Sequence, residues 1–331
     1  MAMVLGTGSI SPPTATVVTL LLGILMVLAG LAFKLSLVPF HFWCPDAFEG
    51  ASAEVCAFLS VASKAAAFAV LVRFVLAFEG AAESIRQIGT ILGLALGVIS
   101  ILSMTYGNLA AYTQNNLKRM LAYSTIAHAG YMVMAISAML ILLHAPAGSP
   151  VHPIADSTAC LEGLMYYLAV YLFMNLAAFA CVALIRNEIF REDVEGYNGL
   201  FQGNAVTKLL CICLAISFVS LVGIPPMGGF FAKFMIFSSA LRAGHVHWFL
   251  WVVLLFGGLN TVFSLFYYLR VLKAMFLAAP AEGIRPLEMP QMTGAYIALV
   301  TLPILVLGAT PLMGDLTATA QYVASSLFAL N

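Results

Sequence analysis

The chain consists mainly of apolar stretches long enough to cross a bilayer, and this feature constrains its fold more than any other. Eight stretches reach or exceed the ~20 residues that a helix needs to span the hydrocarbon core. Only 8% of the residues are charged, whereas a soluble domain carries about 25%. The sequence therefore predicts an all-α polytopic membrane protein. The expected spans are 14–43, 52–78, 88–110, 117–143, 158–185, 205–240, 246–277 and 292–313, followed by a mixed stretch, 314–330, that is typical of an interfacial helix.

Composition and spacing also exclude several classes of function. The 14 basic and 14 acidic residues give a formal net charge of zero, so there is no electrostatic footprint for nucleic acid. The cysteines lack the spacing of a zinc or redox motif, and the histidines form no ligand cluster with cysteines or carboxylates. No dinucleotide fingerprint or P-loop is present. We expect no metal and no cofactor in this chain.

Two of the expected spans carry helix-breaking residues. The first contains Pro39 near its end, and the sixth is interrupted by the sequence GIPPMGG. Proline removes a helical hydrogen bond, and a broken helix is tolerated at membrane depth only where protein or water satisfies the freed backbone. Paired broken helices often mark the ion site of a transporter. In the sixth span the break residues are Gly223, Pro225, Pro226, Gly228 and Gly229.

Three lysines lie inside apolar stretches, and two of them are in the broken spans. They are Lys34, Lys64 and Lys233. A charge at the bilayer centre costs roughly 2.5–3.5 kcal/mol on insertion scales, so such residues usually have a function. Lysines near span ends instead reach the interface with their long side chains. That interpretation fits Lys118, Lys208 and Lys273.

Several spans also carry polar residues at helical spacing. Ser124, His128 and Tyr131 share one face of the fourth span. These stripes, together with the lysines, predict a polar interior that could hold a chain of waters for proton transfer. The alternative is that they join transmembrane helices by hydrogen bonds, and that His128 is a packing residue. The other supporting residues are His41, Tyr171, Asn175, Asn260 and Ser264.

Lysine offers reversible protonation as its chemistry. Burial disfavours the ammonium form, so a buried lysine can exchange protons closer to neutral pH. A neighbouring charge shifts this balance, and a row of lysines can therefore pass a proton along. Lys and Arg are more frequent in the loops on the side of residues 111–118, which predicts that this side is cytoplasmic.

Four segments resemble a known family. FKLSLVPFHFWCPDAFEGASAEV, FLSVASKAAAF, NLAAYTQNNLKRMLAYSTIAHAGYM and LVGIPPMGGFFAKF are similar to the antiporter-like membrane-arm subunits of respiratory complex I, and most similar to subunit N of NADH-quinone oxidoreductase. The resemblance implies a central axis for proton transfer formed by Lys34, Lys64, His128 and Lys233. It also implies that Lys34 pairs with a glutamate on a helix that this chain does not contain.

The family fold has two inverted repeats of five helices and about fourteen spans. The resemblance implies that 14–78 holds the last two helices of the first repeat, that 88–277 is the second repeat, and that 292–331 is a C-terminal helix and tail. The sequence does not decide whether the chain is a fragment, the product of a split gene, or has a misassigned start.

The expected function is that of a proton-translocating subunit in the bacterial plasma membrane. The resemblance implies that NADH, FMN, iron–sulfur clusters and quinone belong to the whole complex, and that subunits M, K and J are partners. Two alternatives are a subunit of a cation/proton antiporter and a truncated fragment with only a packing role.

Overall fold

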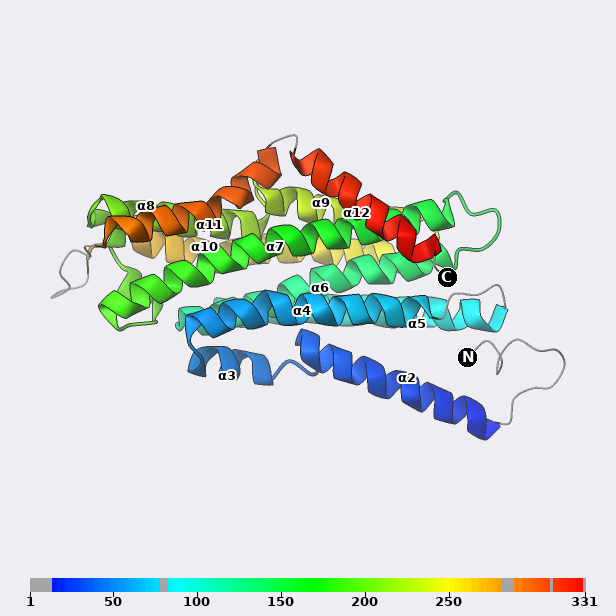
Figure 1. The fold of residues 1–331 in the computed structure, drawn as a ribbon. Helices are drawn as coiled ribbons and strands as arrows, with labels where there is room; N and C mark the ends of the chain where they lie inside the picture. The colour runs from blue at the N-terminus through cyan, green and yellow to red at the C-terminus, as the bar shows by residue number, and fades with distance from the viewer. Residues whose placement is uncertain (1–13, 78–82, 281–288, 310–311, 330–331) are drawn as a thin grey trace.

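The computed structural model describes residues 14–77, 83–280, 289–309 and 312–329. Within these ranges the chain is helical, with two short 3-10 turns and no strand. The helices run back and forth along one common direction (Figure 1). They are α2 (Thr14–Leu35), α3 (Trp43–Gly50), α4 (Ala53–Leu76), α5 (Glu83–Tyr112), α6 (Leu117–Leu143), α7 (Pro153–Ile189), α8 (Ala205–Val222), α9 (Gly228–Gly244), α10 (Phe249–Leu277), α11 (Gln291–Ala309) and α12 (Leu312–Ala329).

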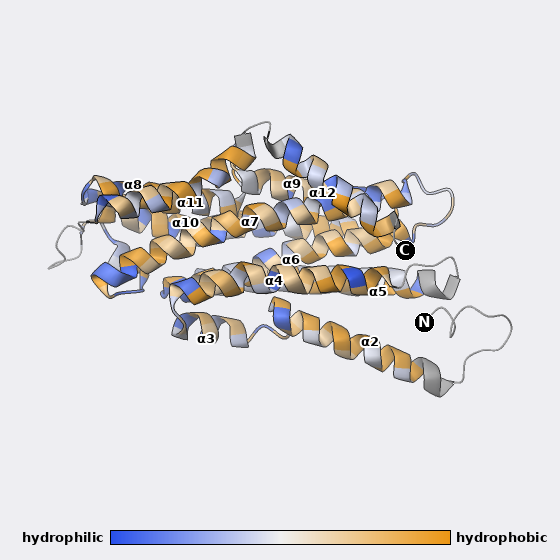
Figure 2. Cartoon of the chain, viewed as in Figure 1, coloured by the Kyte–Doolittle hydropathy of each residue, from blue (hydrophilic) through white to orange (hydrophobic). Residues whose placement is uncertain are grey.

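The predicted membrane class is confirmed. Eight helices in the described ranges are long and apolar enough to cross a membrane. Hydrophobic residues dominate the helix surfaces, and hydrophilic residues gather where α7 meets the loop before α8 (Figure 2). Apolar side chains on the helix surfaces suit a bundle that is surrounded by lipid. The helical backbone suits it as well, because its polar groups are hydrogen-bonded within each helix.

Both predicted helix breaks are present. The first span stops at Leu35, continues through a non-helical segment, 36–42, and resumes as α3. The sixth span stops at Val222, where Gly223 adopts a φ of 90°, a conformation that only glycine reaches without strain. The chain re-enters a helix at Gly228. Each break exposes backbone carbonyls that other groups in the protein must satisfy.

Helix starts at the end that carries the α7–α8 loop are fixed by asparagine caps. The Asn116 side chain accepts a hydrogen bond from the Arg119 amide at 3.0 Å at the start of α6, and Asn204 accepts one from the Thr207 amide at 2.9 Å at the start of α8. An asparagine at this position satisfies an otherwise unpaired helix N–H. The two caps therefore fix the residues at which α6 and α8 begin.

α6 is the central helix of the bundle. All of its residues except Arg119 and Leu143 are buried, and α5, α7, α9, α4 and α3 all pack against it. The stretch expected as an interfacial helix is helical as far as Ala329 and belongs to α12, which follows α11 (Figure 1) and packs against α7. Ala320 and Ala324 lie buried at i, i+4 on α12, and such small side chains allow two helices to approach closely.

Candidate functional site

Two of the three in-span lysines are buried in the bundle. Lys64 of α4 is 2% exposed and donates its Nζ proton to the carbonyl oxygen of Thr125 on α6 at 2.8 Å. Lys233 of α9 is 4% exposed. Neither lysine has a carboxylate partner within the described ranges, so both are held by neutral groups.

Lys233 is placed by the second helix break. Its Nζ donates to the carbonyl oxygen of Val222, the last residue of α8, at 2.9 Å. The same nitrogen lies 4.5 Å from the centre of the Tyr131 ring on α6, where the ring face attracts a cation. A break that frees a carbonyl thus supplies the acceptor for this lysine, which explains why a proline–glycine segment and a buried lysine occur together.

His128 lies on α6 between Thr125 and Tyr131, the two residues that Lys64 and Lys233 contact. It is buried, and its Nδ1 is 2.7 Å from the hydroxyl of Tyr167 on α7. Its ring centre is 6.0 Å from that of Tyr131 and 5.1 Å from that of Tyr171. Tyr171 is also buried, and its hydroxyl has no hydrogen-bond partner within the described ranges. Two tyrosine hydroxyls and an imidazole therefore share one interior region.

α6 forms the spine of this arrangement. The Thr125 carbonyl oxygen accepts a hydrogen bond from Lys64, Tyr131 contacts Lys233, and His128 lies between these two residues on α6. At 1.5 Å per residue, Thr125 and Tyr131 are about 9 Å apart along the helix axis. Groups that can hold or exchange a proton are thus arranged along α6, between its contact with Lys64 and its contact with Lys233.

A second polar network joins α5 to α10 beside this axis. Asn260 donates to Thr105 at 3.0 Å, and Asn108 donates to Asn260 at 3.2 Å. The Tyr267 hydroxyl donates to Asn108 at 3.1 Å. These groups satisfy one another, as buried polar groups must. The network connects to the spine through Tyr131, whose hydroxyl is 3.3 Å from that of Thr261.

The remaining expected site residues lie apart from this axis or bond locally. Lys34 is exposed on the surface of α2. Ser264 and Asn175 donate to carbonyls of their own helices, at 2.7 and 3.1 Å. His41 is buried in the first break, and neither of its ring nitrogens has a partner within the described ranges.

The residues expected at the helix breaks differ in their exposure. Pro39, Pro225 and Pro226 are exposed, whereas Gly228 and Gly229 are buried.

Several residues of the network were not expected from the sequence. Tyr268 bonds Ser124, Thr125 holds Lys64, and Asn108 bridges α5 and α10. Asn108 could have been found as a single amide in an otherwise apolar span, because such residues usually pair in the membrane. Thr125 acts through its backbone carbonyl, and no side-chain pattern predicts that contact.

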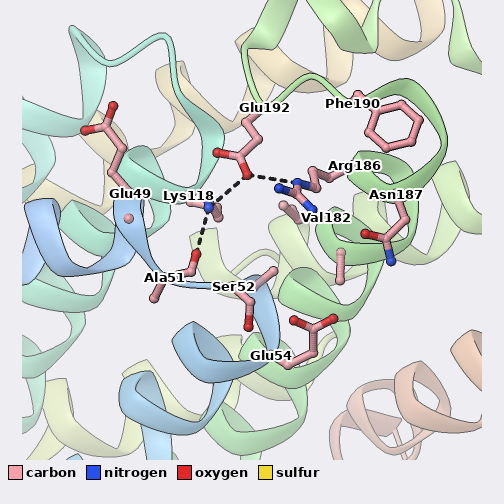
Figure 3. Close-up of a pocket in the computed structure, with 13 residues that line it drawn as sticks. Glu49, Ala51, Ser52, Glu54, Lys118, Val182, Arg186, Asn187, Phe190 and Glu192 are labelled. Atoms are coloured by element: carbon pink, nitrogen blue, oxygen red, sulfur yellow. Dashed lines mark hydrogen bonds and ion pairs between the residues drawn. The ribbon is translucent and has the colours of Figure 1, made fainter.

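A charged cluster, which we call the charged end, lies where α3, α4, α6 and α7 meet at one end of the bundle (Figure 3). Lys118, 5% exposed, forms an ion pair with Glu192 at 2.8 Å and donates to the carbonyl oxygen of Ala51 at 2.7 Å. In the adjoining loop, the Arg191 guanidinium donates to Asp193 at 2.9 Å and holds the pKa of that carboxyl below its usual range. The cluster ties the α3–α4 turn to the α7–α8 loop.

Two broken helices and a buried lysine held by the end of one of them define a polytopic membrane protein of the antiporter-like class. Residues 8–145 and 151–264 match the sequence model described as the NADH:quinone oxidoreductase/Mrp antiporter transmembrane family. The chain belongs to this family.

Similar proteins are consistent with this assignment. The chain is 40% identical over 310 residues to NADH-quinone oxidoreductase subunit N 1 of Roseiflexus castenholzii, covering 92% of this chain and 54% of that protein. It is 39% identical over 294 residues to subunit N of Moorella thermoacetica, covering 88% and 55%. The chain therefore spans about half the length of these relatives.

Solved structures share the fold. A chain of respiratory complex I from Thermus thermophilus with bound aureothin superposes with a TM-score of 0.64 at 32% identity, covering 93% of this chain and 60% of that one. A chain of the Mrp complex from Dietzia sp. superposes with a TM-score of 0.70 at 18% identity, covering 89% and 57%. The second likeness concerns the fold alone.

Proposed function

We propose that this chain carries protons across the bacterial plasma membrane as part of the antiporter-like subunit N of an NADH-quinone oxidoreductase. The observation that supports this most strongly is the pair of buried lysines, Lys64 and Lys233, which contact α6 at Thr125 and Tyr131, one on each side of His128. Burial without a carboxylate partner disfavours the ammonium form of a lysine, so such a side chain can act as a carrier that releases its proton.

In the proposed mechanism, a proton moves from Lys64 to Lys233 through the interior. Lys64 is in contact with α6, and His128 with its Tyr167 partner can accept and donate protons, because imidazole carries a distinct nitrogen on each side. Waters would complete the steps between these side chains. Lys233, held by the end of α8, is the last carrier on this side of the axis.

In the proposed complex, the electrons move in other subunits. NADH, FMN, iron–sulfur clusters and quinone would be bound there, and subunits M, K and J would be neighbours in the membrane arm. We further propose the repeat division 14–78, 88–277 and 292–331. Lys34, exposed on α2, would meet an acidic residue from a segment outside this chain.

Replacing Lys233 with alanine tests this function. In the assembled complex reconstituted into liposomes, Lys233→Ala should lower quinone-coupled proton pumping about 100-fold or more, the scale on which a positioned proton-transfer group acts. Lys208→Ala is the matched control, because Lys208 is an exposed lysine at the start of α8. Pumping by Lys233→Ala equal to that of the control would reject the proposal.

The same liposomes address the antiporter alternative. If the chain acted in a cation/proton antiporter, a sodium gradient would drive proton movement without NADH or quinone. We expect no such movement in the wild-type complex, measured with a pH-sensitive dye.

A further inference from the structure

A cavity at the charged end has no place in the proton axis described above. It has a volume of about 510 Å³ and lies between the α3–α4 turn, the start of α6 and the last turns of α7. Polar and charged groups line it, among them Ser52, Glu54, Lys118, Arg186 and Glu192 (Figure 3). Ser52 and Glu54 are exposed, so the cavity is open to the surface and its polar walls suit water. We call it the vestibule.

A polar stripe on α4 leads from the vestibule toward Lys64. Ser52, Cys56, Ser60 and Lys64 follow one another at intervals of four residues, so they share one face of the helix. Ser52 lines the vestibule, whereas Cys56, Ser60 and Lys64 are 0%, 0% and 2% exposed. Lys64 lies about 18 Å beyond Ser52 along the helix axis, at 1.5 Å per residue.

Two buried aromatic rings lie close in sequence to residues that line the vestibule. Phe48 on α3 and Phe179 on α7 have ring centres 5.9 Å apart, and both are fully buried. Phe48 directly precedes Glu49, and Phe179 lies one helical turn inward from Val182; both Glu49 and Val182 line the vestibule. At the same depth on α4, the Cys56 thiol donates to the Phe48 carbonyl oxygen at 3.2 Å.

We propose that the Phe48–Phe179 pair is a hydrophobic gate between the water-filled vestibule and Lys64. Apolar constrictions interrupt water columns and so block ions without closing sterically. The gate lies between α3 and α7, and Lys118 anchors the α3–α4 turn to the α7–α8 loop through Ala51 and Glu192. A shift of α3 would separate the rings and let water reach the α4 stripe. This inference rests on the proposed function, since it supplies the proton entry to Lys64.

Access of water-soluble reagents to Cys56 tests the gate without measuring pumping. The full chain in its complex would carry Cys56 as the one remaining cysteine of the six in this chain, in membrane vesicles that expose the charged end. The probe is methanethiosulfonate ethyltrimethylammonium, a permanently charged thiol reagent. Phe179→Ala should raise the rate of Cys56 modification about tenfold or more, because thiol reactivity depends on access. Phe48→Ala should behave in the same way.

Two controls keep this outcome interpretable. Phe68→Ala removes another fully buried ring from α4, beyond Lys64, and should leave Cys56 as slow as in the parent. A cysteine placed by Ser52→Cys in the vestibule, with Cys56 removed, should react fastest. If an alanine variant does not assemble, Phe179→Leu keeps the apolar bulk and should react at an intermediate rate.

Equal modification rates in the Phe48, Phe179 and Phe68 variants would overturn the gate. So would a parent chain whose Cys56 reacts as fast as the cysteine in the vestibule. Because labelling reports only access, these results are independent of whether Lys233→Ala abolishes pumping.

Discussion

At the scale of single residues, the site depends on which hydroxyl faces which partner. Tyr166 and Tyr167 are neighbours on α7, yet they point to different groups. The Tyr166 hydroxyl donates to the Leu307 carbonyl on α11 at 2.8 Å, whereas the Tyr167 hydroxyl is 2.7 Å from His128 Nδ1. Both are buried hydrogen bonds of similar length, but only the second belongs to the proposed proton axis.

Substitution of these two tyrosines distinguishes an effect on stability from an effect on proton transfer. Tyr166→Phe and Tyr167→Phe should each destabilise the protein by about 1–3 kcal/mol, the cost of leaving a buried partner unsatisfied. Only Tyr167→Phe should slow proton pumping, because it removes the group that bonds His128. Thermal unfolding of the complex and pumping in liposomes are the two measurements. Equal pumping in the two variants would exclude a role for Tyr167 beyond packing.

At the scale of elements, the second helix break depends on glycine at a close crossing. A Cβ atom on Gly229 would lie 1.9 Å from the carbonyl oxygen of Ser220, and the Gly229 amide donates to the Ser220 hydroxyl at 3.1 Å. The start of α9 is therefore held directly against the end of α8. On α10, by contrast, a Cβ on Gly258 would meet no atom within 4 Å.

Alanine substitution at these two glycines tests the crossing. Gly229→Ala should force the α8–α9 junction apart and cost at least about 1–3 kcal/mol, the typical price of overpacking. It should also disturb pumping, because the junction supplies the acceptor of Lys233. Gly258→Ala should change neither property. Melting of the purified complex measures the first effect, and a normal melting temperature for Gly229→Ala would show that the junction is not tightly packed.

Most of the elements could be predicted from the sequence, because apolar length and helix-breaking residues are local signals. Both breaks were predicted for this reason. The exposure of Lys34 could not be predicted, since it depends on which helices pack beside α2. The packing of α12 on α7 was missed because its mixed composition is also typical of an interface. The gate residues Phe48 and Phe179 resemble any core aromatic until the fold brings them together.

At the scale of the whole molecule, the two breaks are joined by one buried helix. Lys64 contacts α6 near the level of Thr125, and Lys233 contacts it at Tyr131. The helix that follows the first break, α3, packs against α6, and the second break holds Lys233. A movement at either break would therefore reach the same helix, which gives one physical route by which an event at one lysine can affect the other.

Lys64→Arg tests most directly whether Lys64 acts by releasing and regaining a proton. Arginine keeps the positive charge and can still donate to the Thr125 carbonyl, but it stays protonated in proteins. In the assembled complex, with normal electron transfer from NADH to quinone as the check on folding, proton pumping should fall to the level of Lys64→Ala. Pumping at the wild-type level in Lys64→Arg would contradict it, because a fixed charge would then be sufficient.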